Sequence, residues 1–342
     1  MGMLRKTAAA LACVGLLTGM TACAGGNGGN TAADGDTTAT GDMKVAFVPK
    51  IQGIPFFEAM NTGGQQAAKD FGFTWIYSGP TTADPAAQSD VVRSLMQQRV
   101  NALMVAPNDP DSIAPLMKEA ADKGIRVGTT DTDATSSVRE VFVNQATAEG
   151  IGGALLDEVA KPIDGKGKIA IVSCGQTAAN LNSWIDVIKK KQKSDYPDID
   201  IVDVVYADED QPKAVTMAKN LMNANPDLKG LIGPCTTAAP GIAQAVQETG
   251  NIGKVFTVGV GTPQAMLPYL KDGSSTASVL WDVNNQGYLT AWAGWMLAKG
   301  EQFQPTQDVG PIKGVTYNDA DKTLLMGDPL ILTADNAGNY NY

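Results

Sequence analysis

The sequence of 342 residues contains no histidine, and this absence excludes several kinds of chemistry. Histidine is the base of Ser-His-Asp and Cys-His catalytic centres and a common zinc ligand. The phosphate-binding patterns GxGxxG and GxxxxGK[ST] are absent too, which argues against a nucleotide-using enzyme. Enzymes that use carboxylates, a lysine or a cofactor stay open, but the absences favour a protein that binds over one that catalyses.

Positive charge and long apolar runs are also scarce. The chain has 26 lysines and arginines against 36 aspartates and glutamates, a formal net charge of −10. This balance argues against nucleic acid or an anionic membrane surface as a partner, because both attract basic faces. The apolar run at 8–17 is too short for a membrane-spanning helix, which needs about 20 residues.

The N-terminus has the pattern of a secretion signal. Two basic residues precede the short apolar run, and Met20-Thr21-Ala22-Cys23 follows, which resembles the lipobox of bacterial lipoproteins. We predict a signal peptide over 1–22, lipidation of Cys23, and a location on the outer face of the cell membrane. The alternative is an ordinary cleaved signal with an incidental cysteine. Residues 23–42 contain no bulky apolar side chain, which predicts a flexible tether.

From Met43 onward, short apolar strands alternate with segments of helical periodicity, and the alternation restarts near residue 149. Buried strands separated by helices indicate βαβ units and parallel sheets with helices on both faces. We therefore predict an α/β fold of two doubly wound parallel-sheet lobes, with a last helix and a tail that cross back between them. The predicted lobes are 43–146 plus 283–311 and 147–282 plus 312–342.

Ligands of open α/β sheets bind beyond the carboxyl ends of the strands, so the residues that follow each strand are the candidates. Short carboxylates and amides occur there, and Phe56-Phe57 opens the first helix. Carboxylates and amides can hold the hydroxyls of a sugar, while an aromatic ring covers its C–H face. This combination predicts a small sugar-like ligand.

A set of motifs occurs in order along the chain: KVAFVPKIQGIPFFEAM, YSGPTTAD, APNDPDSIAP, FVNQATAEGIG, NPDLKGLIGP, VGVGTPQAMLPYLKDG and LWDVNNQG. With them, the region from Lys44 to about Leu332 resembles the type I periplasmic sugar-binding proteins of ABC importers, and among these the rhamnose-binding and autoinducer-2-binding branch. The resemblance implies two lobes joined by a hinge of three crossovers that closes on the ligand. It also implies a monomeric, non-enzymatic capture subunit without cofactor or metal, whose partner is a membrane permease.

In the autoinducer-2 receptors of this branch, ligand contacts come from a lysine, an aspartate, an Asp-Gln pair and a Pro-x-Ala segment. By motif these positions fall on Lys50, Asp131, Asn180-Leu181, and Pro234 with Thr236. Leu181 cannot hydrogen-bond through its side chain, and a site that lacks such a partner rejects the ligand built for it. The departure argues against autoinducer-2 and favours a deoxyhexose, pentose or related polyol, with rhamnose as the leading candidate.

Several candidate residues also have simpler explanations. Phe56 and Phe57 suit a helix core, Asp131 suits a turn or a helix cap, and Trp281 suits a lobe core. For Asp282, ligand contact and capping of the following helix are both open. The predicted ligand-binding residues are Lys50, Phe56, Phe57, Asp131, Asn144, Asn180, Pro234, Thr236, Trp281 and Asp282.

Cys174 and Cys235 each follow a strand of the second lobe. If that lobe has the usual 2-1-3 strand order, the two strands are neighbours about 4.8 Å apart, within reach of a disulfide in an oxidising compartment. The two cysteines either form this bridge or lie as free thiols near the pocket wall.

Overall fold

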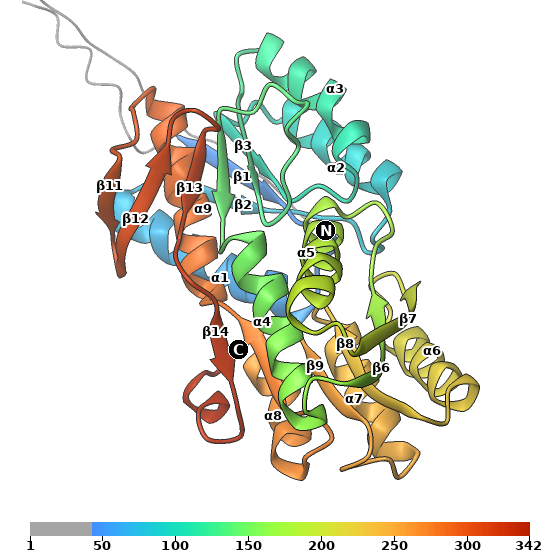
Figure 1. The fold of residues 1–342 in the computed structure, drawn as a ribbon. Helices are drawn as coiled ribbons and strands as arrows, with labels where there is room; N and C mark the ends of the chain where they lie inside the picture. The colour runs from blue at the N-terminus through green and yellow to red at the C-terminus, as the bar shows by residue number, and fades with distance from the viewer. Residues whose placement is uncertain (1–42) are drawn as a thin grey trace, which may run out of the picture. The chain divides into compact units, whose positions relative to one another are not determined.

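Residues 43–342 are the part of the chain that the computed structural model describes (Figure 1). The predicted signal peptide 1–22, the predicted lipidation site Cys23 and the predicted tether 23–42 lie outside these residues. Over the described range, the strands form two sheets, and each sheet is the centre of one lobe. In the same range, no helix combines the length and apolar character that a membrane crossing requires.

The first lobe is built on a parallel sheet with the central strand order β2-β1-β3-β4-β5. In β1, Val45 and Phe47 pack toward α1 and α9, while Ala46 and Val48 pack with α2 and α3 on the other face. A strand covered on both faces has no polar side, which explains its continuous apolar run. The elements are β1 (Lys44–Val48), α1 (Pro55–Phe71), β2 (Thr74–Tyr77), α2 (Pro85–Gln97), β3 (Ala102–Val105), α3 (Pro110–Asp122), β4 (Arg126–Thr130), β5 (Val141–Asn144) and α9 (Val283–Lys299).

The second lobe repeats this plan with the order β7-β6-β8-β9-β10, so the predicted 2-1-3 arrangement is confirmed. All four of these strand pairs are parallel. Both sheets thus direct the carboxyl ends of their central strands toward one region between the lobes. The elements are α4 (Ala148–Ala160), β6 (Gly167–Ser173), α5 (Ala179–Asp195), β7 (Ile199–Tyr206), α6 (Gln211–Ala224), β8 (Leu228–Gly233), α7 (Ala238–Glu248), β9 (Phe256–Gly259), α8 (Pro263–Asp272) and β10 (Ala277–Leu280).

The chain passes between the lobes after β5, after β10 and after β13, which gives the three predicted crossovers. The first two agree with the predicted lobe boundaries, but the third is wrong. Residues 312–325 were assigned to the second lobe, yet β12 and β13 extend the first sheet beside β5, and only β14 joins the second sheet. The cause is the hairpin at Gly310, which folds β12 back onto β11. These late strands are β11 (Thr306–Val309), β12 (Ile312–Asn318), β13 (Thr323–Leu325) and β14 (Leu330–Leu332).

Helices α1 and α9 lie side by side on the first sheet (Figure 1), and two glycines allow their close approach. A Cβ atom on Gly63 would lie 1.8 Å from the carbonyl oxygen of Asn284, and one on Gly287 would lie 1.9 Å from that of Met60. No side chain fits such distances. This packing positions the start of α1, which carries Phe56 and Phe57, against the start of α9.

Candidate functional site

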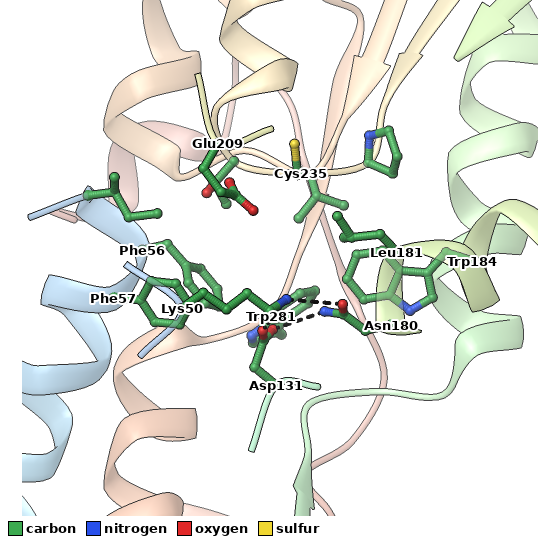
Figure 2. Close-up of a pocket in the computed structure, with 14 residues that line it drawn as sticks. Lys50, Phe56, Phe57, Asp131, Asn180, Leu181, Trp184, Glu209, Cys235 and Trp281 are labelled. Carbon is green, nitrogen blue, oxygen red and sulfur yellow. Dashed lines mark hydrogen bonds and ion pairs between the residues drawn. The ribbon is translucent and has the colours of Figure 1, made fainter. Parts of the chain in front are cut away.

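A pocket lies between the lobes, beyond the carboxyl ends of the central strands (Figure 2). Its lining combines a polar cluster, a group of aromatic rings and an acidic wall. The free space is about 30 Å³, room for roughly two water molecules. The lining residues are Lys50, Ile54, Phe56, Phe57, Asp131, Asn180, Leu181, Trp184, Glu209, Pro234, Cys235, Thr236, Val260 and Trp281.

The polar cluster is formed by Lys50, Asp131 and Asn180, which satisfy one another's charges and hydrogen bonds. The Lys50 ammonium lies 3.0 Å from an Asp131 carboxylate oxygen and donates to Asn180 Oδ1 at 3.1 Å, and Asn180 Nδ2 donates to Asp131 Oδ1 at 3.3 Å. Lys50 and Asp131 are each 4% exposed. Because Asn180 belongs to α5 of the second lobe, the cluster joins the two lobes directly.

Local backbone structure presents each member of this cluster. Lys50 follows β1, and Asn180 lies in the first turn of α5. Asp131 directly follows β4 with φ of +62°, in the left-handed region that aspartate tolerates better than most residues. Strained backbone of this kind occurs frequently at binding sites. A second bond between the lobes, from Thr177 Oγ1 to the carbonyl of Asn108 at 3.1 Å, lies near the cluster.

The aromatic group consists of Phe56, Phe57, Trp184 and Trp281, all of which are at most 4% exposed. Trp281 is at its centre: its ring meets that of Phe56 edge-on at 5.9 Å between centroids, and that of Trp184 at 6.0 Å. These rings come from both lobes and from the β10–α9 crossover. They offer the apolar surface against which the C–H face of a sugar can pack.

A buried chain of hydrogen bonds ties the pocket to two of the crossovers. The indole N–H of Trp281 donates to Gln286 Oε1 at 2.6 Å, Gln286 Nε2 donates to Gln145 Oε1 at 3.1 Å, and Gln145 Nε2 donates to the carbonyl of Asp131 at 3.3 Å. Gln145 and Gln286 are at most 1% exposed. The chain therefore connects the pocket's central ring to the backbone of Asp131 through the hinge.

The acidic wall belongs to the second lobe. Glu209 follows β7, is half-buried, and accepts a hydrogen bond from Thr237 Oγ1 at 3.3 Å. Burial raises the pKa of its carboxyl to about 7, although the nearby Lys50 ammonium acts in the opposite direction. Figure 2 shows Glu209 beside Cys235, on the other side of the pocket from Asp131.

Cys174 and Cys235 are joined by a disulfide, with a Cα–Cα distance of 6.1 Å. Of the two arrangements left open by the sequence, the structure has the bridge, and Cys235 nevertheless lines the pocket. The bridge connects the ends of the neighbouring strands β6 and β8. The two sulfurs and the Glu209 carboxylate lie within 4.8 Å of one another, but disulfide sulfurs are not thiolates, so we assign no metal to this group.

Most of the predicted residues lie together, and two do not. Lys50, Phe56, Phe57, Asp131, Asn180, Pro234, Thr236 and Trp281 line the pocket.

Asp282 lies outside the pocket because its carboxylate caps α9, accepting from the backbone N–H of Asn285 at 2.9 Å. Of the two explanations that the sequence left open for Asp282, the structure has the helix cap. Asn144 lines a neighbouring hollow, which Asp131 and Asn180 separate from the pocket.

Sequence reasoning did not predict Ile54, Trp184, Glu209 and Val260 as pocket residues. Glu209 was detectable, since it lies just beyond the end of β7 at Tyr206, where the strand-end rule applies. Trp184 was detectable as well: it is four residues after Asn180, one turn along the same helix face. Leu181, singled out as the departure from the autoinducer-2 pattern, does line the pocket.

Comparisons with known proteins agree with this geometry. The family described as "Periplasmic binding protein domain" matches residues 45–302. Among solved structures, LsrB from Clostridium saccharobutylicum in complex with AI-2 has a TM-score of 0.83 and 29% identity, covering 88% of this chain and 100% of that one. A solute-binding protein from Clostridium phytofermentas with bound L-rhamnose has a TM-score of 0.80 and 27% identity, covering 87% and 98%. The xylitol-binding protein of Mycolicibacterium smegmatis is 28% identical over 92% of this chain and 85% of its own length.

Proposed function

The chain belongs to the periplasmic binding protein family, and we propose that it captures a rhamnose-like deoxyhexose, a pentose or a related small polyol for an ABC importer. Proteins of this family are non-enzymatic, extracytoplasmic transport components of sugar import. The observation that carries the specific proposal is the Lys50–Asp131–Asn180 cluster, which joins both lobes beside a group of aromatic rings. Donors, acceptors and an apolar face in one pocket are what a monosaccharide needs.

The proposed mechanism is hinge closure. The small free space requires the lobes to part before a sugar enters, because Lys50 and Asn180 occupy the region that hydroxyls would fill. Ligand hydroxyls then replace the direct bonds of the cluster and favour the closed arrangement, which the permease recognises. Of the lining residues, we propose Lys50, Phe56, Phe57, Asp131, Asn180, Pro234, Thr236 and Trp281 as ligand contacts.

A thermal-shift screen of the mature chain against pentoses, deoxyhexoses and alditols tests the proposal, followed by calorimetric titration of each compound that raises the melting temperature. A bound ligand stabilises the folded state by mass action, at about 2.7 kcal/mol for a concentration 100 times the Kd. We expect a saturable hit among the deoxyhexoses, pentoses or alditols. No shift with any of these compounds would refute the proposal.

The second candidate ligand is AI-2, which is favoured by the similarity to LsrB and by Lys50, Asp131 and Pro234 at the corresponding positions. Leu181 argues against it, because this 3% exposed side chain offers the pocket no hydrogen bond. Parallel titrations with AI-2 and L-rhamnose separate the two. Tighter binding of AI-2 than of every sugar would reverse the assignment and indicate signal capture.

We further propose that the protein is a monomer held at the outer face of the cell membrane by lipid on Cys23. The supporting pattern is the sequence Met20-Thr21-Ala22-Cys23. Mass spectrometry of the N-terminal peptide from membrane fractions tests the anchor, with a lipid-modified Cys23 as the expected result. An unmodified peptide cleaved elsewhere would contradict it.

A further inference from the structure

The two carboxylates that line the pocket differ in whether a cation compensates them. Asp131 is paired with Lys50 at 3.0 Å. Glu209 has no ion pair within residues 43–342, and the Thr237 hydroxyl is its hydrogen-bond donor there. Lys50 is the cation of the lining, so the ionised pocket carries one negative charge in excess, located on Glu209.

This excess charge is unfavourable when the lobes close, because a carboxylate removed from water without a partner loses much of its hydration. The raised pKa of Glu209, about 7, expresses the same penalty. A neutral sugar supplies hydroxyl donors but leaves the charge in place. A ligand with a positive charge at this point removes the penalty.

The groups around Glu209 do not neutralise it from outside the pocket. Asp208 is an exposed neighbour whose carboxylate pairs with Lys213 at 2.5 Å, and Asp210 caps α6. Asp208 and Asp131 both oppose ionisation of Glu209, while Lys50 favours it from the far side of the pocket. The disulfide beside Glu209 carries no charge.

We propose that Glu209 is a specificity-determining residue that selects an amino-deoxy sugar or amino polyol, by accepting hydrogen bonds from a protonated amino group of the ligand. The inference rests on the proposed function and narrows it. A protonated amine beside Glu209 gains a charge-assisted hydrogen bond, which is stronger than a neutral one. The opposite orientation is disfavoured, because the amine would then meet the Lys50 ammonium.

In this arrangement the remaining hydroxyls face the opposite side of the pocket. Asp131, Asn180 and Lys50 accept from and donate to them, and the ring of Trp281 supports the C–H face. Figure 2 shows Glu209 on one side of the pocket and Lys50, Asp131 and Asn180 on the other, with Trp281 beside the latter group. The ligand orientation is therefore set by charge, with its cationic end in the second lobe.

The experiment compares matched pairs of compounds by calorimetric titration of the mature chain at about pH 7.5, where the amino group of an aminoalditol is largely protonated and the less basic amino group of a 2-amino sugar is partly protonated. The pairs are glucose with glucosamine, galactose with galactosamine, and alditols with their 1-amino-1-deoxy derivatives. We expect at least one amino compound to bind about tenfold more tightly than its hydroxyl partner. In Glu209→Gln this preference should disappear, so that the two members of a pair bind with about equal affinity.

Asp208→Asn is the matched control. It removes a negative charge from the residue next to Glu209 in the chain, and the Asp208 side chain does not line the pocket. It should retain the preference. The wild-type preference should also weaken as the pH falls through 7, because Glu209 then takes up a proton, and this readout needs no variant. Neutral sugars that bind as tightly as their amino partners would overturn the inference and leave the proposed function intact. Failure of both series, together with failure of the pentoses, deoxyhexoses and alditols of the thermal-shift screen, would overturn both.

Discussion

The two polar sides of the pocket differ in whether the protein itself compensates the charges that lie there. On one side, Lys50, Asp131 and Asn180 join the lobes and bind one another through an ion pair and two hydrogen bonds. On the other, Glu209 and the Cys174–Cys235 bridge lie within the second lobe, and the carboxylate has one hydroxyl donor among the described residues. The comparison shows that a charge satisfied by the protein can hold lobes together, whereas a charge left unsatisfied is available to select a ligand.

The largest expected effect comes from removing the Cys174–Cys235 disulfide, which lies on the Glu209 side of the pocket. The cysteines are 61 residues apart, so replacing both by serine should lower the free energy of unfolding by roughly 4 kcal/mol, from the regained freedom of the unfolded chain. Denaturant titration of the oxidised wild type and the double variant measures this. Alkylation followed by mass spectrometry without reductant is the control, and two modified thiols at these positions would show that the bridge does not form.

A substitution in the Lys50–Asp131–Asn180 cluster should lower ligand affinity more than it lowers stability. Asp131→Ala leaves Lys50 without its carboxylate and removes a ligand acceptor, so we expect an affinity loss of about 100-fold. The ligand-free melting temperature should move little, because opened lobes let water solvate Lys50. Exposed Asp122→Ala is the matched control. Equal losses of binding and stability in Asp131→Ala would mean that Asp131 is structural.

The hydrogen-bond chain from Trp281 through Gln286 and Gln145 tests whether the hinge positions Asp131 and the rest of its cluster. Gln286→Leu leaves the indole N–H of Trp281 and the Oε1 atom of Gln145 without a partner in a buried site. We expect the free energy of unfolding to fall by about 2 kcal/mol and ligand affinity to fall severalfold. Exposed Gln97→Leu should change neither quantity. Unchanged affinity in Gln286→Leu would show that the hinge does not position the pocket.

The smallest expected effect is a pH dependence of ligand-free stability from Glu209. Its carboxyl has a pKa of about 7 in the folded chain against 4.5 for an unperturbed glutamate, so the folded state holds a proton over that interval. Stability from this group is present below pH 4.5 and is lost as the pH rises through 7, by about 1 kcal/mol after allowance for its partial exposure. Wild type and Glu209→Gln should differ in this slope when unfolded at pH 5 and pH 8, and identical slopes would contradict the shift.

How far the sequence could predict the site depended on whether a residue's role was local. Lys50 and Asp131 follow strands, and the strand-end rule for α/β sheets finds them. The same rule applied after β7 also finds Glu209, so the sequence was sufficient to predict this residue. Asp282 also follows a strand, but its capping of α9 depends on the geometry of one helix end, which sequence leaves open.

The C-terminal strands β11 to β13 are different, because their position depends on contacts between residues far apart in the chain. These strands extend the first sheet at its edge, where exposed residues give little apolar periodicity. Their assignment to the first lobe follows from pairing with β5, a contact between residues far apart in the chain. Such pairings are decided by which sheet edge is free, and no local pattern records that.

The sequence by itself determined the alternation of buried strands and helices, the two-lobed plan, and the residue types at the strand ends, because these depend on periodicities of a few residues. The tertiary structure decided which of those strand ends meet. It brought Asn180 of one lobe to Lys50 and Asp131 of the other, joined Cys174 to Cys235, and gave Glu209 no ion pair among residues 43–342. Charge compensation depends on distance in space, and that distance is set only when both lobes are folded.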